Sequence, residues 1–407
     1  MGAEAASAGG RTRIPRQAYL LFVGLFLAVA SNNLLTPLLP DIRDDMGVSL
    51  AAIGAFVSTY GLARLIVDLP SGALTTRIGP HPVAAVGVVL IVLSSAGAAV
   101  APRFGLLIVA RIVAGIGAGL VATVVLSALS DVAPPDIRGR VMSLYQVANN
   151  LGVAIYPLIG GLVGSFAGWR SAFALAAGAA VLSGSVLIPA LRRVPASRAQ
   201  RAARGTTAAA QNEPQPRRGA PIVAFGVIYF GVIANMVNRH GFRNTVLPLF
   251  AASHLGLNAI EIAIGITVMS LTGVLVTIPG AALGDRIGRR RIVVAGLALM
   301  AVSGVVFVLV ATDFVMFMLA AVLLGCGDFF ASSQTALLSD LVEGPRRAMA
   351  LGAYRFCVDL GALVGPVLLA TLMSLHSVGL AIGAASGILA TAALANRVGT
   401  PSRSAPP

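Results

Sequence analysis

Long apolar runs dominate this chain of 407 residues and recur from one end to the other. Each run holds about 20 residues, which is enough to cross a hydrocarbon core of about 30 Å as a helix. A bilayer offers the backbone no water to bond, so a spanning segment is expected to be helical. The pattern therefore predicts an all-α membrane protein that crosses the bilayer many times.

We predict twelve spans, in two groups of six separated by a polar break. The predicted spans cover residues 18–40, 50–73, 82–101, 105–130, 140–165 and 169–191, and then 221–250, 259–282, 291–311, 314–339, 348–374 and 377–396. The break at 192–220 is rich in Arg, Ala, Gln and Pro, a composition typical of a flexible basic linker. The expected parts are a tail (1–17), a six-helix half (18–191), the linker (192–220), a second six-helix half (221–396) and a tail (397–407).

Charged residues make up only 11% of the chain, against about a quarter in soluble proteins. The net charge is +14, and all 29 basic residues are arginines. They lie at the ends of apolar runs instead of forming a nucleic-acid patch, so they indicate topology. With the N-terminus inside, the inner segments carry 21 arginines and the outer loops only Arg43, Arg103 and Arg170. We expect both termini and the linker to be cytoplasmic, in a cell inner (plasma) membrane.

The two halves are related by a shift of 209 residues. The coincident landmarks include Pro70 with Pro279, Arg77 with Arg286, Gly79 with Gly288, Arg138 with Arg347, Tyr145 with Tyr354 and Pro157 with Pro366. Because each half has six spans, the repeats share one orientation. They are expected to be related by an axis along the membrane normal.

Two short segments carry a family resemblance. "ALGDRIGRRR" (residues 282–291) matches the signature loop of the major facilitator superfamily, G-x-L-x-D-R-x-G-R-R, except that Ala281 replaces the first glycine. "GALTTRIGPH" (residues 72–81) is a weaker copy in which Thr76 replaces the aspartate. The chain resembles this superfamily over essentially its whole length. The resemblance implies a cytoplasmic gate formed by Gly72, Arg77, Gly79, Asp285, Arg286, Gly288 and Arg289.

Two further segments resemble motifs of proton-coupled members. In "RIVAGIGAGL", Arg111 matches an arginine that the family ties to proton movement, although a structural hydrogen bond to backbone carbonyls is the alternative. "GVAIYPLIGG" resembles the span-five motif of drug–proton antiporters, with Tyr156 in place of its central glycine. Small residues at helix contacts are common in membranes, which is the plainer explanation of that pattern.

Spans two and eleven each hold an arginine and an aspartate one helical turn apart, Arg64 with Asp68 and Arg355 with Asp359. In the superfamily these spans face each other and run antiparallel. Counting from the cytoplasmic landmarks, Asp68 and Arg355 lie at a depth of about 12 Å, and Arg64 and Asp359 at about 18 Å. We therefore expect a cluster of four charges between the halves. The alternative is a permanent pair within each helix, without a role in coupling.

Other polar residues within the spans are also candidates. Asp328 is a further proton or cation site, because a lone carboxylate near the midplane is costly. The expected cavity residues are Asn32, Asn33, Gln146, Asn149, Asn150 and Tyr156. Arg239, His240 and Arg243 are expected at an outer vestibule, as solvated charges or as an anion-attracting, pH-sensing mouth.

The chain lacks lysine, so it has no phosphate-binding loop of the G-x-x-x-x-G-K type, and no metal-ligand spacing appears. We expect no cofactor and no enzyme activity, but a monomeric secondary transporter driven by an ion gradient. Its expected partners are a small-molecule substrate, protons and the lipid bilayer, with no nucleic acid. The leading expectation is proton-coupled export of a small, largely apolar compound. Uptake of a small polar metabolite, such as a sugar or organic acid, is the alternative, and a receptor or scaffold is a third class.

Overall fold

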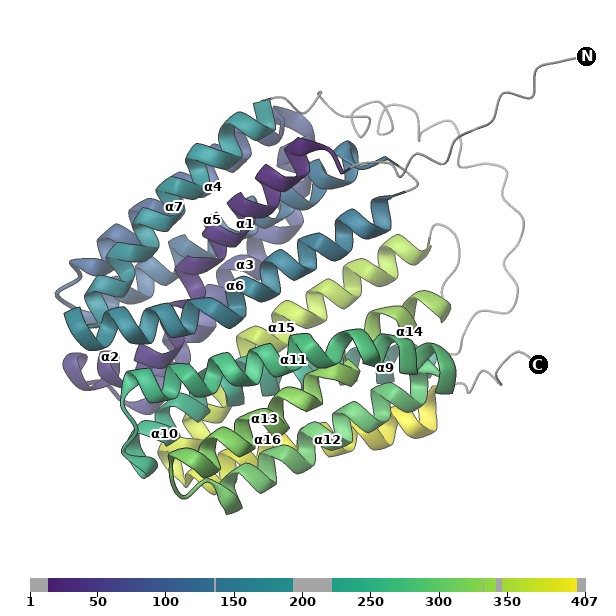
Figure 1. Cartoon of the computed structure of the whole chain (residues 1–407). Helices are drawn as coiled ribbons and strands as arrows, with labels where there is room; N and C mark the ends of the chain where they lie inside the picture. The colour runs from purple at the N-terminus through teal and green to yellow at the C-terminus, as the bar shows by residue number, and fades with distance from the viewer. Residues whose placement is uncertain (1–13, 135–136, 193–221, 332, 342–345, 401–407) are drawn as a thin grey trace, which may run out of the picture.

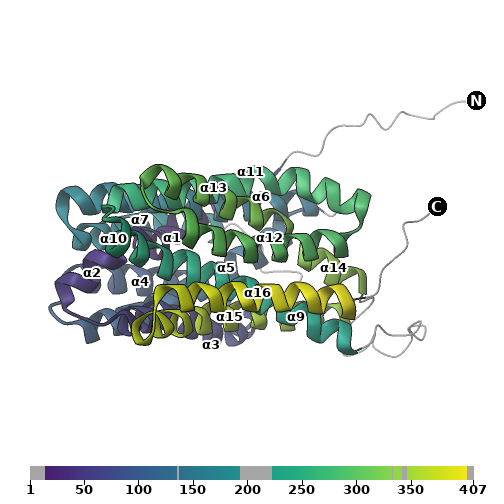
Figure 2. The same cartoon turned by 90° about the horizontal axis from the view of Figure 1, so that it is seen from below.

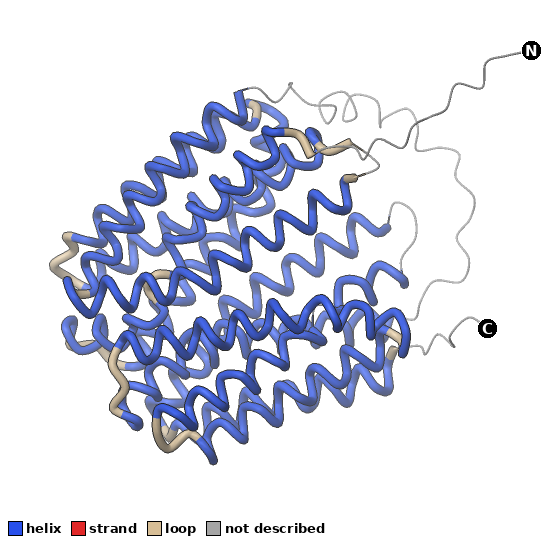
Figure 3. Tube along the Cα trace, in the orientation of Figure 1, coloured by secondary structure: helices blue, strands red, loops and turns tan. Residues whose placement is uncertain are grey.

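The computed structural model describes residues 14–134, 137–192, 222–331, 333–341 and 346–400. The described part of the chain is helical and contains no strand. The first half consists of α1 (Arg16–Asn33), η1 (Thr36–Leu38), α2 (Leu39–Met46), α3 (Leu50–Ile78), α4 (Pro80–Ala99), α5 (Phe104–Val132), α6 (Arg138–Ala167) and α7 (Trp169–Arg192). Figures 1 and 3 show these helices lying side by side as one bundle.

The second half repeats this order. It consists of α9 (Ile222–Met236), the π-helical segment η2 (Val237–Val246), α10 (Leu247–Leu255), α11 (Ala259–Ile287), α12 (Arg289–Val310), α13 (Phe314–Ala331), α14 (Ser333–Leu341), α15 (Arg346–Leu375) and α16 (Val378–Gly399). A shift of 209 residues carries the bounds of α3 onto those of α11. It also carries Gly47 onto Gly256, and both glycines end their helices in the left-handed conformation. The sequence repeat is thus a structural repeat.

Local sequence explains where the paired helices begin and end. The Ser49 side chain accepts the amide of Ala52 and caps α3, and Asn258 with Glu261 forms a capping box at the start of α11. Each of these helices then runs to a single glycine, Gly79 or Gly288, that joins it to the next helix. Their φ angles of 92° and 99° are unfavourable for other residues. The signature segments are therefore the last helical turns before a one-residue joint.

Ten of the described helical stretches are long and apolar enough to cross a membrane. Two of the twelve predicted spans depart from a simple apolar helix. The span formed by α9, η2 and α10 is continuous but polar in its middle, where η2 lies. In the span formed by α13 and α14, the stretch Phe314–Gly327 is apolar, and residue 332 between the two helices lies outside the described residues.

Buried apolar residues divide the molecule into two ends. We call the end where α1 begins and α16 ends the terminal end, and the opposite end, with α2 and α10, the distal end (Figures 1 and 2). At the distal end one apolar core combines both halves; it includes Leu38, Phe56, Phe242 and Leu369. At the terminal end the first half has its own core around Val124, and the second half has another around Leu297. Among the described residues, the halves therefore share a core only at the distal end.

Candidate functional site

The contact between α3 and α15 holds the predicted charges. The two helices run antiparallel, and the close approach begins at the distal end, where Gly54 faces the carbonyl of Pro366. One turn further, the Ser58 hydroxyl accepts the backbone N–H of Val367 at 3.2 Å. Continuing along α3, the side of the helix that faces α15 reaches Asp68. The charges therefore lie where the shared distal core gives way to the separate cores.

Asp68 is the anion on which two arginines converge. Its Oδ2 accepts from Nε and Nη2 of Arg355 at 3.3 and 3.2 Å, which joins the two halves. The same oxygen lies 3.7 Å from Nε of Arg64, one turn back on its own helix. Asp68 thus makes a contact within its own helix and a contact between the halves, whereas among the described residues no ion pair within 4.0 Å joins Arg355 to Asp359 on α15.

Asp359 lies beside this group on α15 and is 5% exposed. Its electrostatic neighbours are Arg64, Asp68 and Arg355. Among the described residues, the ion pairs within 4.0 Å in this cluster all involve Asp68, and the expected Arg64–Asp359 pair is not one of them. The four charges lie together, but they are shared unequally, because Asp68 takes both arginines.

The glycines of α5 make room for this arrangement. A Cβ on Gly115 would lie 2.5 Å from the carbonyl oxygen of Tyr60, so this glycine sets how closely α5 approaches α3. A Cβ on Gly119 would lie 2.9 Å from Oδ1 of Asp68. That oxygen is buried and has no hydrogen-bond partner. A side chain at position 119 would therefore displace the shared carboxylate.

Arg111 occupies a separate buried site on α5, close to the cluster. It is 4% exposed, and its Nη2 donates to Oδ1 of Asn32 at 3.1 Å. Its guanidinium carbon lies 4.8 Å from the ring centre of Phe56 and 5.1 Å from that of Tyr60. Nε and Nη1 are buried without a hydrogen-bond partner. Its charge is thus held by an amide and two aromatic faces instead of a carboxylate.

The polar π-helical segment η2 lies deeper than a vestibule. Gly241 packs against the backbone of Gly365 on α15, and His240 has Arg64 among its electrostatic neighbours, together with Arg239 and Arg243. Arg243 is only 3% exposed, and its Nε contacts the sulfur of Met269. Arg243 therefore differs from the solvated outer charge that we expected, because the distal core closes over it. π-Helical turns are frequent at functional sites.

The predicted cavity residues do not all share one environment. Asn32 binds Arg111, and the Asn33 side chain donates to the carbonyl of Val29 in its own helix. Tyr156 is buried against Phe26 at 5.0 Å between ring centres, and its hydroxyl has no partner. The remaining three lie along α6: Gln146 is exposed, and Asn149 and Asn150 are half-buried.

The gate residues lie at the terminal end, near the glycine joints. Arg77 and Arg286 are exposed in the last turns of α3 and α11, and Arg289 begins α12. The Thr76 hydroxyl donates to the carbonyl of Ala73 in its own helix. The side chains of Asp285 and Asp328 lie outside the described residues. Their roles in the gate and the pathway therefore stay predictions.

The motif on α6 is a packing surface at the distal end. A Cβ on Gly160 would overlap the backbone of Leu34, which follows α1. A Cβ on Gly161 would lie 2.4 Å from Cβ of Ala263 and 2.6 Å from the carbonyl oxygen of Ala259, both on α11 of the other half. Adjacent glycines thus hold α6 against its own half and against the opposite one.

A family model described as Major Facilitator Superfamily matches the chain twice, over residues 21–243 and 228–407. The chain belongs to the major facilitator superfamily. The double match covers both halves. Together with the helices, it establishes a multi-pass membrane transporter of two six-helix halves, which is not an enzyme.

Individual relatives agree with this placement. The quinolone resistance protein NorA of Staphylococcus aureus (strain COL) is 23% identical over 365 residues, which cover 89% of this chain and 91% of NorA. An uncharacterized MFS-type transporter of Bacillus subtilis (strain 168), YhcA, is 27% identical over 154 residues, 38% of this chain and 29% of YhcA.

Solved structures of two other transporters share the fold. A peptide transporter POT in complex with sulfate superposes with a TM-score of 0.77 at 16% identity, covering 95% of both chains. A bacterial homologue of the lysosomal transporter Spinster gives a TM-score of 0.77 at 15% identity, covering 94% of this chain and 96% of that one.

Sequence reasoning missed part of the site. Phe56 and Tyr60 hold Arg111, and they lie on the same stripe of α3 as Arg64 and Asp68. The spacing of four residues was a usable signal, because it places all four side chains on one helix face. Gly119 gave no comparable signal, since only the packed structure shows which side chain faces it.

Proposed function

We propose that this chain exports small, largely apolar compounds in exchange for protons, by alternating access between its two halves. The observation that carries the proposal is the shared carboxylate of Asp68, which takes Arg355 from the opposite half and Arg64 from its own. The similarity to NorA, named for quinolone resistance, supports export of a drug-like compound.

The charge cluster links the separation of the two halves to the protonation of its carboxylates. Separating α3 from α15 at this point removes Arg355 from Asp68. Charges in low dielectric are tolerable when paired, and breaking a buried pair leaves an uncompensated charge. A proton that neutralises a carboxylate of the cluster lowers that cost. Movement of the halves and proton binding are thereby linked.

Asp359 is the carboxylate that we assign to the proton. It is buried, and Asp68 takes the two arginines that Asp359 would otherwise share. A buried carboxylate without a close counter-ion is favoured in its neutral form. Asp68, which contacts Arg64 on its own helix and Arg355 on α15, instead holds the two halves together.

Reconstitution of the purified protein in liposomes tests this division of roles. With an imposed pH gradient, we expect export of a suitable drug-like substrate together with proton flux. Asp359→Asn should abolish gradient-driven export but keep exchange of substrate for substrate, which needs no net proton movement. Asp68→Asn should impair both. Gradient-independent transport of every substrate by the unmodified protein would contradict proton coupling.

A charge swap tests the contact itself. Asp68→Arg and Arg355→Asp should each inactivate the protein, and the double variant should regain transport because the pair is restored with reversed polarity. The matched control is the pair of Asp45 and Arg170, 2.9 Å apart and within one half. Swapping these two should leave coupling intact. A well-folded but inactive Asp68–Arg355 double variant would argue against the proposed role.

A further inference from the structure

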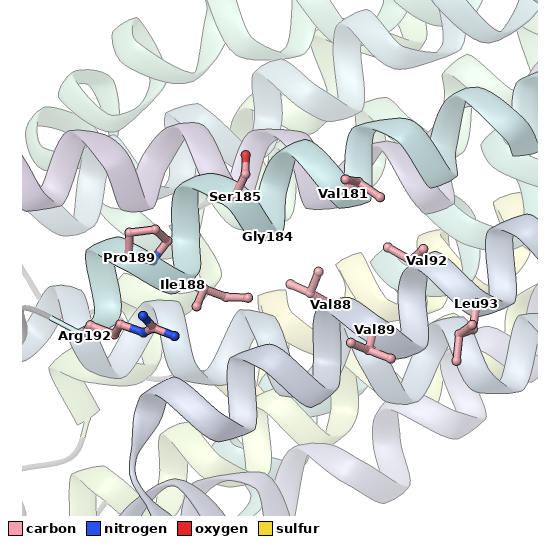
Figure 4. A pocket seen from close by; sticks show the side chains of 10 residues that line it. All are labelled: Val88, Val89, Val92, Leu93, Val181, Gly184, Ser185, Ile188, Pro189 and Arg192. Carbon is pink, nitrogen blue, oxygen red and sulfur yellow. The ribbon is translucent and has the colours of Figure 1, made fainter.

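A groove lies on the outside of the bundle between α4 and α7, away from the contact between the halves. Its volume is about 490 Å³, and nine of its ten lining residues are uncharged. Its lining residues are Val88, Val89, Val92, Leu93, Val181, Gly184, Ser185, Ile188, Pro189 and Arg192 (Figure 4). The groove narrows where Gly184 brings α7 close to Val88, since a Cβ on this glycine would lie 2.7 Å from Cγ1 of that valine.

One end of the groove is basic. Arg192 is the last residue of α7, and its Nε donates to Nε2 of His81 near the start of α4 at 3.0 Å. Among the residues that the structure describes, this bond engages only Nε of the guanidinium, which lies at the mouth of the groove (Figure 4). The terminal Nη groups remain as a fork, the geometry that suits a phosphate.

The length of the groove matches one leaflet. From Arg192 to Val181, the lining of α7 extends about 16 Å at 1.5 Å per residue. Half of a hydrocarbon core of about 30 Å is about 15 Å. Val89, Leu93 and Val181 are each more than half exposed, as expected for side chains that meet acyl chains. If the anionic group of an amphiphile binds Arg192, its tail can therefore follow the groove as far as the bilayer midplane.

We propose that this groove is a binding site for an anionic phospholipid, with the phosphate at Arg192 and one acyl chain along α4 and α7. The positive charge of Arg192 favours an anionic headgroup, and the apolar residues that line the groove favour an acyl chain. With the terminal end in the cytoplasm, as the arginine distribution predicts, the site lies in the inner leaflet, where anionic lipids attract basic residues. His81 is a positioning residue, because it acts through Arg192.

Native mass spectrometry of the full chain tests the site with two lipids of equal chains, dioleoyl phosphatidylglycerol and dioleoyl phosphatidylcholine. We expect the anionic lipid to bind about fivefold more tightly, the effect of one arginine near a charged headgroup. Arg192→Gln should remove that preference. The matched control, Arg16→Gln, removes an exposed charge from the same end of the molecule and should keep it.

A second variant tests the acyl part of the groove. Ser185→Phe fills the groove at an exposed position and should weaken binding of both lipids, whereas Ser165→Phe, exposed on α6 outside the groove, should not. Melting curves of all variants report folding. An unchanged lipid preference in Arg192→Gln, or unchanged binding in Ser185→Phe, would overturn the proposal. These readouts need no transport, so they stand apart from the test of proton coupling.

Discussion

At the scale of single residues, Arg111 shows how a buried charge is held without a counter-ion. Asn32, Phe56 and Tyr60 surround its guanidinium, and two of its nitrogens have no hydrogen-bond partner. A charge in such a place is costly and is therefore expected to serve a function. The alternative raised by the sequence, bonding to backbone carbonyls, is not the contact seen here.

Arg111→Met separates function from stability. Replacing a buried ionic group by an apolar one of similar size is often neutral or stabilising. We therefore expect an unchanged or higher melting temperature in detergent, together with loss of gradient-driven transport in liposomes. A protein that melts much earlier, with transport falling only in proportion to folded protein, would show that Arg111 is purely structural.

At the scale of elements, the close contact of α6 with α11 holds the distal end closed. Gly161 allows the contact, because any side chain there would meet Ala259 and Ala263. The glycine motif of α6 thus acts at the seam between the halves. Small residues allow close packing of helices in membranes. Here they allow close packing at a contact between the halves that has to open during transport.

Gly161→Val is expected to shift the protein toward distal opening. Overpacking costs about 1–3 kcal/mol, which changes a two-state population by roughly tenfold. Spin labels at the exposed distal residues Asp44 and Ser253 would report a longer distance by pulsed electron resonance, with the native cysteines replaced. Gly178→Val on α7, where a Cβ meets nothing within 4 Å, is the control. An unchanged distance distribution would contradict the role of this contact.

At the scale of the whole molecule, the buried apolar cores distinguish the two ends of the transporter. One core joins the halves at the distal end, and each half has its own core at the terminal end. We therefore expect access to the contact between the halves from the terminal end. The Asp68–Arg355 pair lies at the boundary between the two regions.

The arginine distribution predicts that the terminal end is cytoplasmic. Single cysteines at Asp44 and Ser253 should react with a membrane-impermeant maleimide added to intact cells. A cysteine at the exposed Arg77 should react only after the membrane is opened. Labelling of Arg77→Cys in intact cells would reverse the proposed orientation. The native cysteines, Cys326 and Cys357, are removed beforehand.

The sequence by itself determined the twelve spans, the repeat and the glycine joints. Span length is set by bilayer thickness, and a joint of one residue between long helices needs a glycine at positive φ. The sequence also placed Asp68 at the depth of Arg355, because helical rise converts residue number directly into depth.

Only the tertiary structure decided how the charges are shared and which regions are sealed. Asp68 takes both arginines because Gly119 leaves room for its carboxylate, and Arg243 is buried because the distal core closes over η2. The groove that ends at Arg192 exists because Gly184 sets the approach of two helices far apart in the sequence. Such distances depend on side chains from several helices packing together, which no single stretch of sequence contains.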